Sequence, residues 1–361
     1  MNSLNQQSLV TLDRQHPDFM KYLLGTFSKD HRALPLKSLN IRTAHETVTF
    51  RIVSLKDLSK PSWLVVWLKA LRPRAFLQIL IPMFLVLCLS ESQGLLIHPD
   101  LPWLATFGML FLFASLLFAN DVQDHLSGVD RILPDRGSRA IQNGWLTAST
   151  LQGVSTLCLA AAALLAIPLF FAVPFALLMF LPAVLIGSWA FYRRSESFKD
   201  VWTGSFALFL LAGPLLAIGY QTALTEGFDV QGIALGCLWG WLVLFPMHMR
   251  ALSQLVAEGR TGSSRTLVGR LGFDRSVKMI QLWWIVGLFG FVGYHFLDQA
   301  PFWFWLFLFL LVAFSTRFVR ALRALKSPAG SAVDAVRKQG EFYFHALILL
   351  WVLEALWRMR P

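Results

Sequence analysis

The segment "LPWLATFGMLFLFASLLFANDVQDHLSGVD", from Leu101 to Asp130, joins two patterns that decide how the chain folds. Its first part, residues 101–119, contains no charged side chain and is close to the length of about 20 residues that a helix needs to cross a bilayer. Its second part brings three aspartates, Asp121, Asp124 and Asp130, directly after the apolar run. A hydrophobic span that ends in several acids predicts a membrane helix with a polar site at one end.

The composition extends this interpretation to the whole chain. Of its 361 residues, 56% are hydrophobic and only 15% are charged, well below the share usual in soluble domains. Nine apolar segments are long enough to cross a bilayer as helices, some after borrowing flanking residues. They are residues 76–90, 101–119, 147–167, 170–189, 201–220, 232–249, 279–296, 302–314 and 342–356. We expect an all-α integral membrane protein with nine spans, although the third and fourth segments touch at Pro168 and a single bent or re-entrant pair is an alternative there.

The distribution of lysine and arginine predicts the orientation of these spans. Cations follow the second, fourth, sixth and eighth segments, whereas residues 91–100, 221–230 and 297–300 contain no Lys or Arg. Because Lys and Arg are retained on the cytoplasmic side, we expect the N-terminus in the cytoplasm of a bacterium and the C-terminus outside its inner membrane. The net charge of +11 is then mainly a topology signal. Its cations are scattered over several loops, so a nucleic-acid partner is not expected.

Residues 1–65 differ from the rest of the chain. They are more polar, mixed in charge, and lack the short apolar core and small-residue cleavage site of a signal peptide. We expect a cytoplasmic extension at residues 1–65, in which "HETVTFRIVSL" (His45–Leu55) is compatible with a strand, and a membrane domain at residues 66–361. The sequence does not indicate what the extension does.

The acids after the second span have a spacing that suits chemistry. If the helix continues past Asn120, Asp121 and Asp124 lie on one face, where their oxygens suit Mg²⁺, a hard cation that often bridges a carboxylate to a phosphate. Acids near hydrocarbon need such a counter-charge. The downstream Arg136 and Arg139 are suited to phosphate oxygens. This pattern favours a site for a diphosphate on a lipid-soluble tail; the alternative is that these acids are solvated loop residues.

The string Asn120-Asp121-x-x-Asp124-x-x-x-Gly128-x-Asp130, followed by Arg139 and Gly144, resembles the first aspartate motif of the UbiA superfamily of intramembrane prenyltransferases. Its form with Gly128 and Asp130 looks most like the dihydroxynaphthoate prenyltransferases of menaquinone synthesis. Three further landmarks occur in the family's order: "WLKALRPRAF" from Trp67, a loop tyrosine at Tyr192, and "SSRTLVGRLG" from Ser263. The resemblance covers roughly residues 67 to 356.

The resemblance implies nine helices around a central cavity, with Mg²⁺ and an isoprenyl diphosphate at its cytoplasmic end. In the family pattern, the first motif holds the metal and nearby cations hold the diphosphate. The implied metal ligands are Asn120, Asp121 and Asp124, and the implied catalytic residues are Asp121, Asp124 and, more distantly, Asp130. The implied diphosphate-binding residues are Arg72, Asn120, Arg139, Tyr192 and Lys199.

The second aspartate motif of the family is altered in this chain. The stretch "MRALSQLVAEGRTGSSRTL" from Met249 has Gln254 and Glu258 where the family has two aspartates. Three explanations are open. Gln254 and Glu258 offer oxygen ligands for a displaced second Mg²⁺. Alternatively, Arg250 or Arg260 replaces the charge of that metal, or catalysis has been lost.

We therefore expect an enzyme that transfers a polyprenyl group from its diphosphate to an aromatic acceptor such as a naphthoate or benzoate. Two other functions remain open. A terpene cyclase of the same fold needs no acceptor, and a non-catalytic membrane binding or scaffold protein is favoured by the altered second motif. The sequence identifies no base for deprotonating an acceptor.

Overall fold

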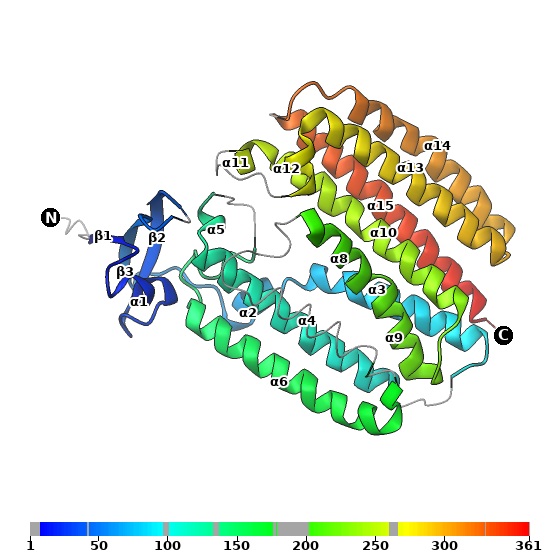
Figure 1. Cartoon of the computed structure of the whole chain (residues 1–361), viewed down its shortest axis with the longest axis horizontal. Coiled ribbons are helices and arrows are strands. Elements are labelled where there is room, and N and C mark those ends of the chain that lie inside the picture. The colour runs from blue at the N-terminus through cyan, green and yellow to red at the C-terminus, as the bar shows by residue number, and fades with distance from the viewer. Residues whose placement is uncertain are drawn as a thin grey trace. The chain divides into compact units, whose positions relative to one another are not determined.

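The computed structural model describes residues 8–41, 43–96, 101–132, 137–175, 178, 202–259, 266–328 and 330–360. Eight helical segments among them are long and apolar enough to cross a membrane. They are Pro73–Ser92 (α3), Leu101–Leu126 (α4), Ala148–Ala172 (α6), Gly204–Thr225 (within α8, Trp202–Ala212, and α9, Pro214–Thr225), Val230–Ser253 (α10), Phe273–Leu297 (α13), Phe302–Arg323 (α14) and Ser331–Arg358 (α15) (Figure 1). A mostly helical membrane architecture is thus confirmed, with a small β-sheet in the N-terminal part that the all-α prediction did not include.

The predicted count of nine spans is not settled by these helices. Eight of the predicted segments coincide with them, whereas most of the segment at residues 170–189 lies outside the described residues. The third segment does not end at Pro168, where it was predicted to touch the fourth, because α6 continues through Pro168 to Ala172. A proline inside a helix is tolerated in a membrane span where neighbouring groups satisfy the freed backbone carbonyl.

The described residues fall into two compact units. The first contains residues 8–76 and 109–164, and the second contains residues 77–108, 165–175 and 202–360, with the gaps given above.

A small β-sheet forms the N-terminal part of the first unit. Strands β1 (Leu9–Asp13), β3 (Thr47–Ser54) and β2 (His31–Leu39) pair antiparallel in that order, next to helix α1 (Phe19–Leu24). Side chains alternate between the two faces of a strand, so Val48 and Phe50 point to the same side, where both are buried. They pack in one cluster with Leu12, Phe19 and Leu23. The strand expected near His45–Leu55 is confirmed.

The helical part of the first unit packs through small side chains. It consists of α2 (Trp63–Leu71), the later part of α4, the start of α6 and the segment between them. Ser115 of α4 and Ser155 of α6 are buried, and their hydroxyl oxygens lie 3.2 Å apart. Small and hydroxyl-bearing residues allow close helix packing in membranes, where the hydrophobic effect does not drive helices together.

The second unit is built around α10. Trp241 of α10 and Trp283 of α13 stack with ring centroids 3.8 Å apart, and each indole N–H donates to the other residue's carbonyl oxygen, at 3.0 and 2.9 Å. On α14, in contrast, large apolar side chains such as Phe302 (83% exposed) and Phe309 (69% exposed) face outward. An apolar outer surface of this kind is stable against lipid and not against water. The chain is therefore an integral membrane protein.

Candidate active site

Helix α4 carries three of the predicted site residues on its last two turns. It ends at Leu126, so the predicted continuation past Asn120 is confirmed. Asn120, Asp121 and Asp124 are 9%, 3% and 1% exposed, respectively. The alternative that these acids are solvated loop residues is therefore wrong, because they lie within the helix and are buried. Asn120 donates from its amide nitrogen to Asp124 Oδ2 over 3.2 Å, so its NH₂ group faces the carboxylate.

Asp130 lies on the short helix α5 (Val129–Ile132) and faces the same small space as Asp121. The evidence is the position of Gly137, whose φ of +71° suits glycine. A Cβ atom at Gly137 would lie 3.2 Å from Asp121 Oδ1 and 3.6 Å from Asp130 Oδ1. The next backbone N–H, that of Ser138, donates to Asp121 Oδ2 over 3.3 Å. The chain after α5 thus folds back so that two buried carboxylates flank one glycine.

Two of the predicted diphosphate-binding cations lie beside these acids. Arg72, the C-cap of α2, places Nη2 2.9 Å from Asp121 Oδ1 and donates to the Leu117 carbonyl oxygen over 3.1 Å. Arg139 donates from Nη1 to the backbone oxygen of Asp130 over 2.8 Å. Both arginines have left-handed backbones, with φ of 51° and 61°. Such conformations cost roughly 1–2 kcal/mol each outside glycine and are concentrated at functional sites.

Two polar residues that sequence reasoning missed complete this site. Gln142 donates from Nε2 to Asp130 Oδ2 over 2.5 Å, and the same nitrogen lies 3.4 Å from His125 Nδ1. His125 Nε2 lies 2.9 Å from the carbonyl oxygen of Leu23. In the sequence, both residues look like ordinary polar neighbours of a motif, and only their contacts reveal their place.

The donor set at the end of α4 fits a hard divalent cation. Three buried carboxylates and one amide oxygen lie within eleven consecutive residues, 120–130, and like charges this close need a counter-charge. The three aspartates do not converge on one point, since among the described residues the only three His, Asp or Glu side chains with ligand atoms within 4.8 Å of one another are elsewhere. Mg²⁺ does not require such convergence, because it commonly uses one or two carboxylates and completes its shell with water and phosphate.

The altered second motif lies in the second unit. Gln254 is the C-cap of α10, and its backbone N–H donates to the carbonyl oxygens of Arg250 and Ala251. Glu258, on α11 (Leu255–Gly259), is 8% exposed. The Thr266 hydroxyl donates to Glu258 Oε2 over 2.8 Å and also accepts from the first turn of α12 (Leu267–Leu271). The structure thus joins the surviving acid to the threonine of the "SSRTLVGRLG" stretch.

Lys199 and Tyr192 lie outside the described residues, as do Arg136 and Arg260. Six of the predicted site residues come together in the first unit: Arg72, Asn120, Asp121, Asp124, Asp130 and Arg139.

A second polar cluster lies in the second unit and consists of the buried His295 and Glu354 and the half-buried Asp298 and Arg358. The first three are the side chains whose ligand atoms lie within 4.8 Å of one another. The Arg358 guanidinium already binds both acids, with Nη1 2.8 Å from Asp298 Oδ2 and with Nε hydrogen-bonded to Glu354. Burial raises the pKa of Asp298, and the guanidinium opposes that rise. One fixed cation therefore partly offsets the charge of the two acids and ties the end of α15 to the turn after α13.

No family model matches the chain. No curated protein matches its sequence. Solved structures do resemble it. A digeranylgeranylglyceryl phosphate synthase superposes with a TM-score of 0.55 at 16% identity, covering 81% of this chain and 98% of that one. A UbiA homologue from Archaeoglobus fulgidus bound to GPP and Mg²⁺ gives a TM-score of 0.51 at 16% identity, covering 79% and 99%. The same homologue bound to DMAPP and Mg²⁺ gives 0.50 at 18%, covering 78% and 99%. The chain thus has the UbiA-type fold.

Proposed function

We propose that this protein is a Mg²⁺-dependent prenyltransferase of the UbiA superfamily, which transfers a polyprenyl group from its diphosphate to an aromatic acceptor in quinone-type lipid biosynthesis. The observation that carries the proposal is the buried acidic end of α4, where Asp121 and Asp130 flank one space with an arginine beside each. The UbiA fold gives independent support, because homologues with this fold are bound to GPP or DMAPP together with Mg²⁺.

The residues of the first motif have distinct proposed roles. Asn120, Asp121 and Asp124 hold Mg²⁺, and Asp130 orients the site from α5. Bound Mg²⁺ would neutralise the diphosphate as its bond to carbon breaks. Arg72 and Arg139 hold diphosphate oxygens, because guanidinium groups form paired, charge-assisted hydrogen bonds with phosphate. Lys199 and Tyr192 are proposed as further diphosphate contacts on the basis of the family pattern.

Gln254 and Glu258 are the proposed ligands of a second Mg²⁺. Glu258 is one methylene longer than aspartate, and its bond from Thr266 fixes one carboxylate oxygen. Because Gln254 is neutral, this metal would be held more weakly than the first. The longer side chain of Glu258 and the neutral side chain of Gln254 also favour a second candidate function. This is a membrane protein that binds isoprenyl diphosphates without turning them over.

The proposed acceptor is aromatic, and the form of the motif with Gly128 and Asp130 favours a naphthoate of the menaquinone type. Glyceryl phosphate acceptors are also included in the assay, because one structural neighbour is a digeranylgeranylglyceryl phosphate synthase. The proposed location is the inner membrane of a bacterium, with the site cytoplasmic and the C-terminus outside, on the basis of the Lys and Arg distribution.

The test uses purified full-length protein in nanodiscs with Mg²⁺, labelled isoprenyl diphosphates, and naphthoate, benzoate and glyceryl phosphate acceptors. We expect prenylated aromatic product from the wild type, and a loss of about 10²–10³-fold in turnover for Asp121→Ala and Asp124→Ala. Asp334→Ala, on the exposed start of α15, is the matched control. A hydrocarbon product without acceptor would instead establish a cyclase. Diphosphate binding that needs Asp121 but gives no product would establish the non-catalytic function.

A further inference from the structure

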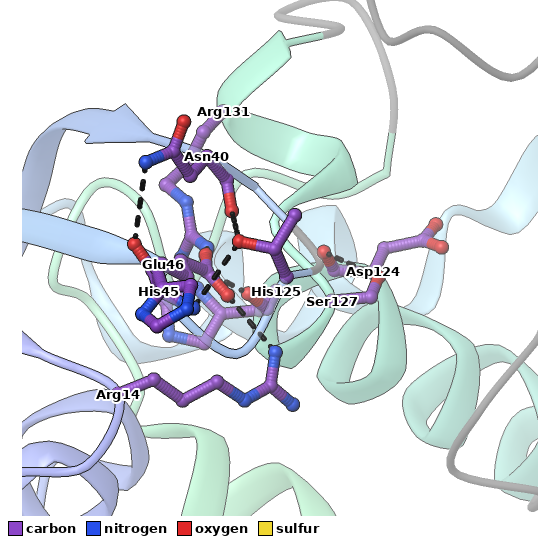
Figure 2. A network of polar contacts seen from close by, with 9 residues as sticks. Arg14, Asn40, His45, Glu46, Asp124, His125, Ser127 and Arg131 are labelled. Atoms are coloured by element: carbon purple, nitrogen blue, oxygen red, sulfur yellow. Dashed lines mark hydrogen bonds and ion pairs between the residues drawn. The ribbon is translucent and has the colours of Figure 1, made fainter.

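A buried ion pair joins the N-terminal sheet to α5, the short helix that follows α4. Glu46, which directly precedes β3, is 1% exposed, and its two oxygens bind different arginines. Arg131 of α5 places Nη2 2.5 Å from Glu46 Oε1, and Arg14, just after β1, places Nη1 3.0 Å from Oε2 (Figure 2). The Arg131 side chain is 4% exposed, and it also donates to the carbonyl oxygen of His125 over 3.4 Å. One acid of the extension thus fixes both α5 and the last turn of α4.

Close packing accompanies this ion pair. Leu126, the last residue of α4, packs against the buried cluster of the sheet. The next turn contains Gly128, whose φ is +79°, and a Cβ atom there would lie 2.5 Å from Arg131 Nη2 and 2.8 Å from Ile41 Cγ2. A larger residue at Gly128 would therefore displace either the sheet or the arginine. The extension and the aspartate motif have surfaces that fit each other in detail.

A chain of hydrogen bonds leads from helix α1, which packs on the sheet, into the acidic site. The Leu23 carbonyl can only accept a hydrogen bond, so the Nε2 atom of the buried His125 carries the proton. In the neutral ring His125 Nδ1 then accepts, which requires the NH₂ group of Gln142 and not its oxygen. The second hydrogen of that NH₂ group is donated to Asp130 Oδ2. The backbone of α1 thereby fixes the tautomer of His125, and this tautomer fixes the orientation of the Gln142 amide. The amide in turn holds one carboxylate oxygen of Asp130 in place.

We propose that His125 and Gln142 are positioning residues through which helix α1 of the N-terminal extension orients Asp130 toward the bound metal and diphosphate. This inference rests on the proposed function of the first motif. It gives the extension a task, since α1 and the sheet that packs on it then act as a permanent part of the site. Groups that hydrogen-bond to metal-site carboxylates typically contribute 10–100-fold to metal affinity or activity without touching the substrate.

The test compares full-length Gln142→Leu with wild type by the affinity for Mn²⁺ and inorganic pyrophosphate, measured by electron paramagnetic resonance. Leucine removes both hydrogen bonds and keeps a similar size. We expect a loss of about 10–100-fold in affinity, with an unchanged melting temperature. Gln152→Leu, an exposed glutamine on α6 in the same unit, is the matched control and should bind as the wild type does. His125→Leu should produce the same loss as Gln142→Leu, and the double variant no more than either, because both act through one chain.

The outcomes separate this inference from the proposed function. If Asp121→Ala leaves Mn²⁺–pyrophosphate binding intact, the proposed function fails. If Asp121→Ala abolishes binding while Gln142→Leu binds as the wild type does, only the positioning role is overturned. Should Gln142→Leu not fold, Gln142→Asn replaces it, because the shorter amide cannot reach both His125 and Asp130; wild-type affinity in that variant overturns the inference equally.

Discussion

Two acidic clusters in this protein contain similar residues in different arrangements. The cluster of His295, Asp298 and Glu354 contains Arg358, whose guanidinium binds both carboxylates. At the end of α4, Arg72 meets Asp121 through one oxygen, and the Arg139 guanidinium binds the backbone oxygen of Asp130. In the first cluster one guanidinium joins the two carboxylates. In the second, Asp121 and Asp130 lie on either side of Gly137, which has no side chain of its own to place between them.

This difference shows why acid content alone does not identify a ligand site. Buried carboxylates must be neutralised in either case, because an isolated charge in an apolar surrounding is costly. An arginine of the chain itself joins the helices permanently. Carboxylates that are arranged around a small residue, with cations held at the edge, instead suit a cation that arrives with a ligand.

The largest expected contrast is in turnover. Asp121→Asn should lower prenyl transfer by about 10²–10³-fold, because it removes a charge that acts on the leaving diphosphate. Its melting temperature should not fall, since the change removes one of several neighbouring buried charges. Glu354→Gln should leave turnover unchanged. Kinetics with a labelled donor would measure both, and equal losses in the two variants would show that the clusters do not differ in function.

The next contrast is in stability and is expected for Arg358→Met. Glu354 is 2% exposed, so losing its cation should cost about 3 kcal/mol of unfolding free energy, seen as a lower melting temperature. The vacated cluster then offers one imidazole and two carboxylates, which suit Zn²⁺. Added Zn²⁺ should therefore raise the melting temperature of this variant and leave the wild type unchanged. A variant as stable as the wild type would show that the arginine does not neutralise the cluster.

The fold and half of the site could be predicted from local sequence. Apolar runs of this length are stable only in lipid, and the spacing of Asp121 and Asp124 predicts a shared helix face, which α4 confirms. The resemblance also predicted Arg72 and Arg139, and both lie beside the acids.

The contacts of the N-terminal extension with α4 and α5 could not be predicted from local sequence. Glu46 and Arg131 are 85 residues apart, and Leu23 and His125 are 102 apart. No periodicity links them, because the pairing depends on how the strands close and on where α4 ends. Leu23 moreover contacts His125 through its backbone carbonyl, which no side-chain pattern reveals.

A smaller effect is expected for Arg72→Lys. Lysine keeps the charge, but its single ammonium cannot reproduce the planar fork that binds phosphate, nor hold Asp121 and the Leu117 carbonyl at fixed angles. The KM for the isoprenyl diphosphate should rise about tenfold, with a smaller change in kcat. Arg74→Lys, two residues further along and exposed, is the control. An unchanged KM for Arg72→Lys would show that this guanidinium serves Asp121 alone.

The smallest expected effect is the pH dependence of stability that Asp298 contributes. Burial raises the pKa of Asp298 above its ordinary value of 3.8, and Arg358 only partly opposes this rise. The native state therefore holds the proton more tightly than the unfolded chain does. Ionisation of Asp298 thus costs stability. This cost is absent below pH 3.8 and fully present once the pH exceeds the native pKa.

Asp298→Asn cannot ionise, so its melting temperature relative to wild type should increase as the pH rises from acidic to neutral. A relative melting temperature that falls over this range would mean that the ion pair with Arg358 outweighs the burial of Asp298.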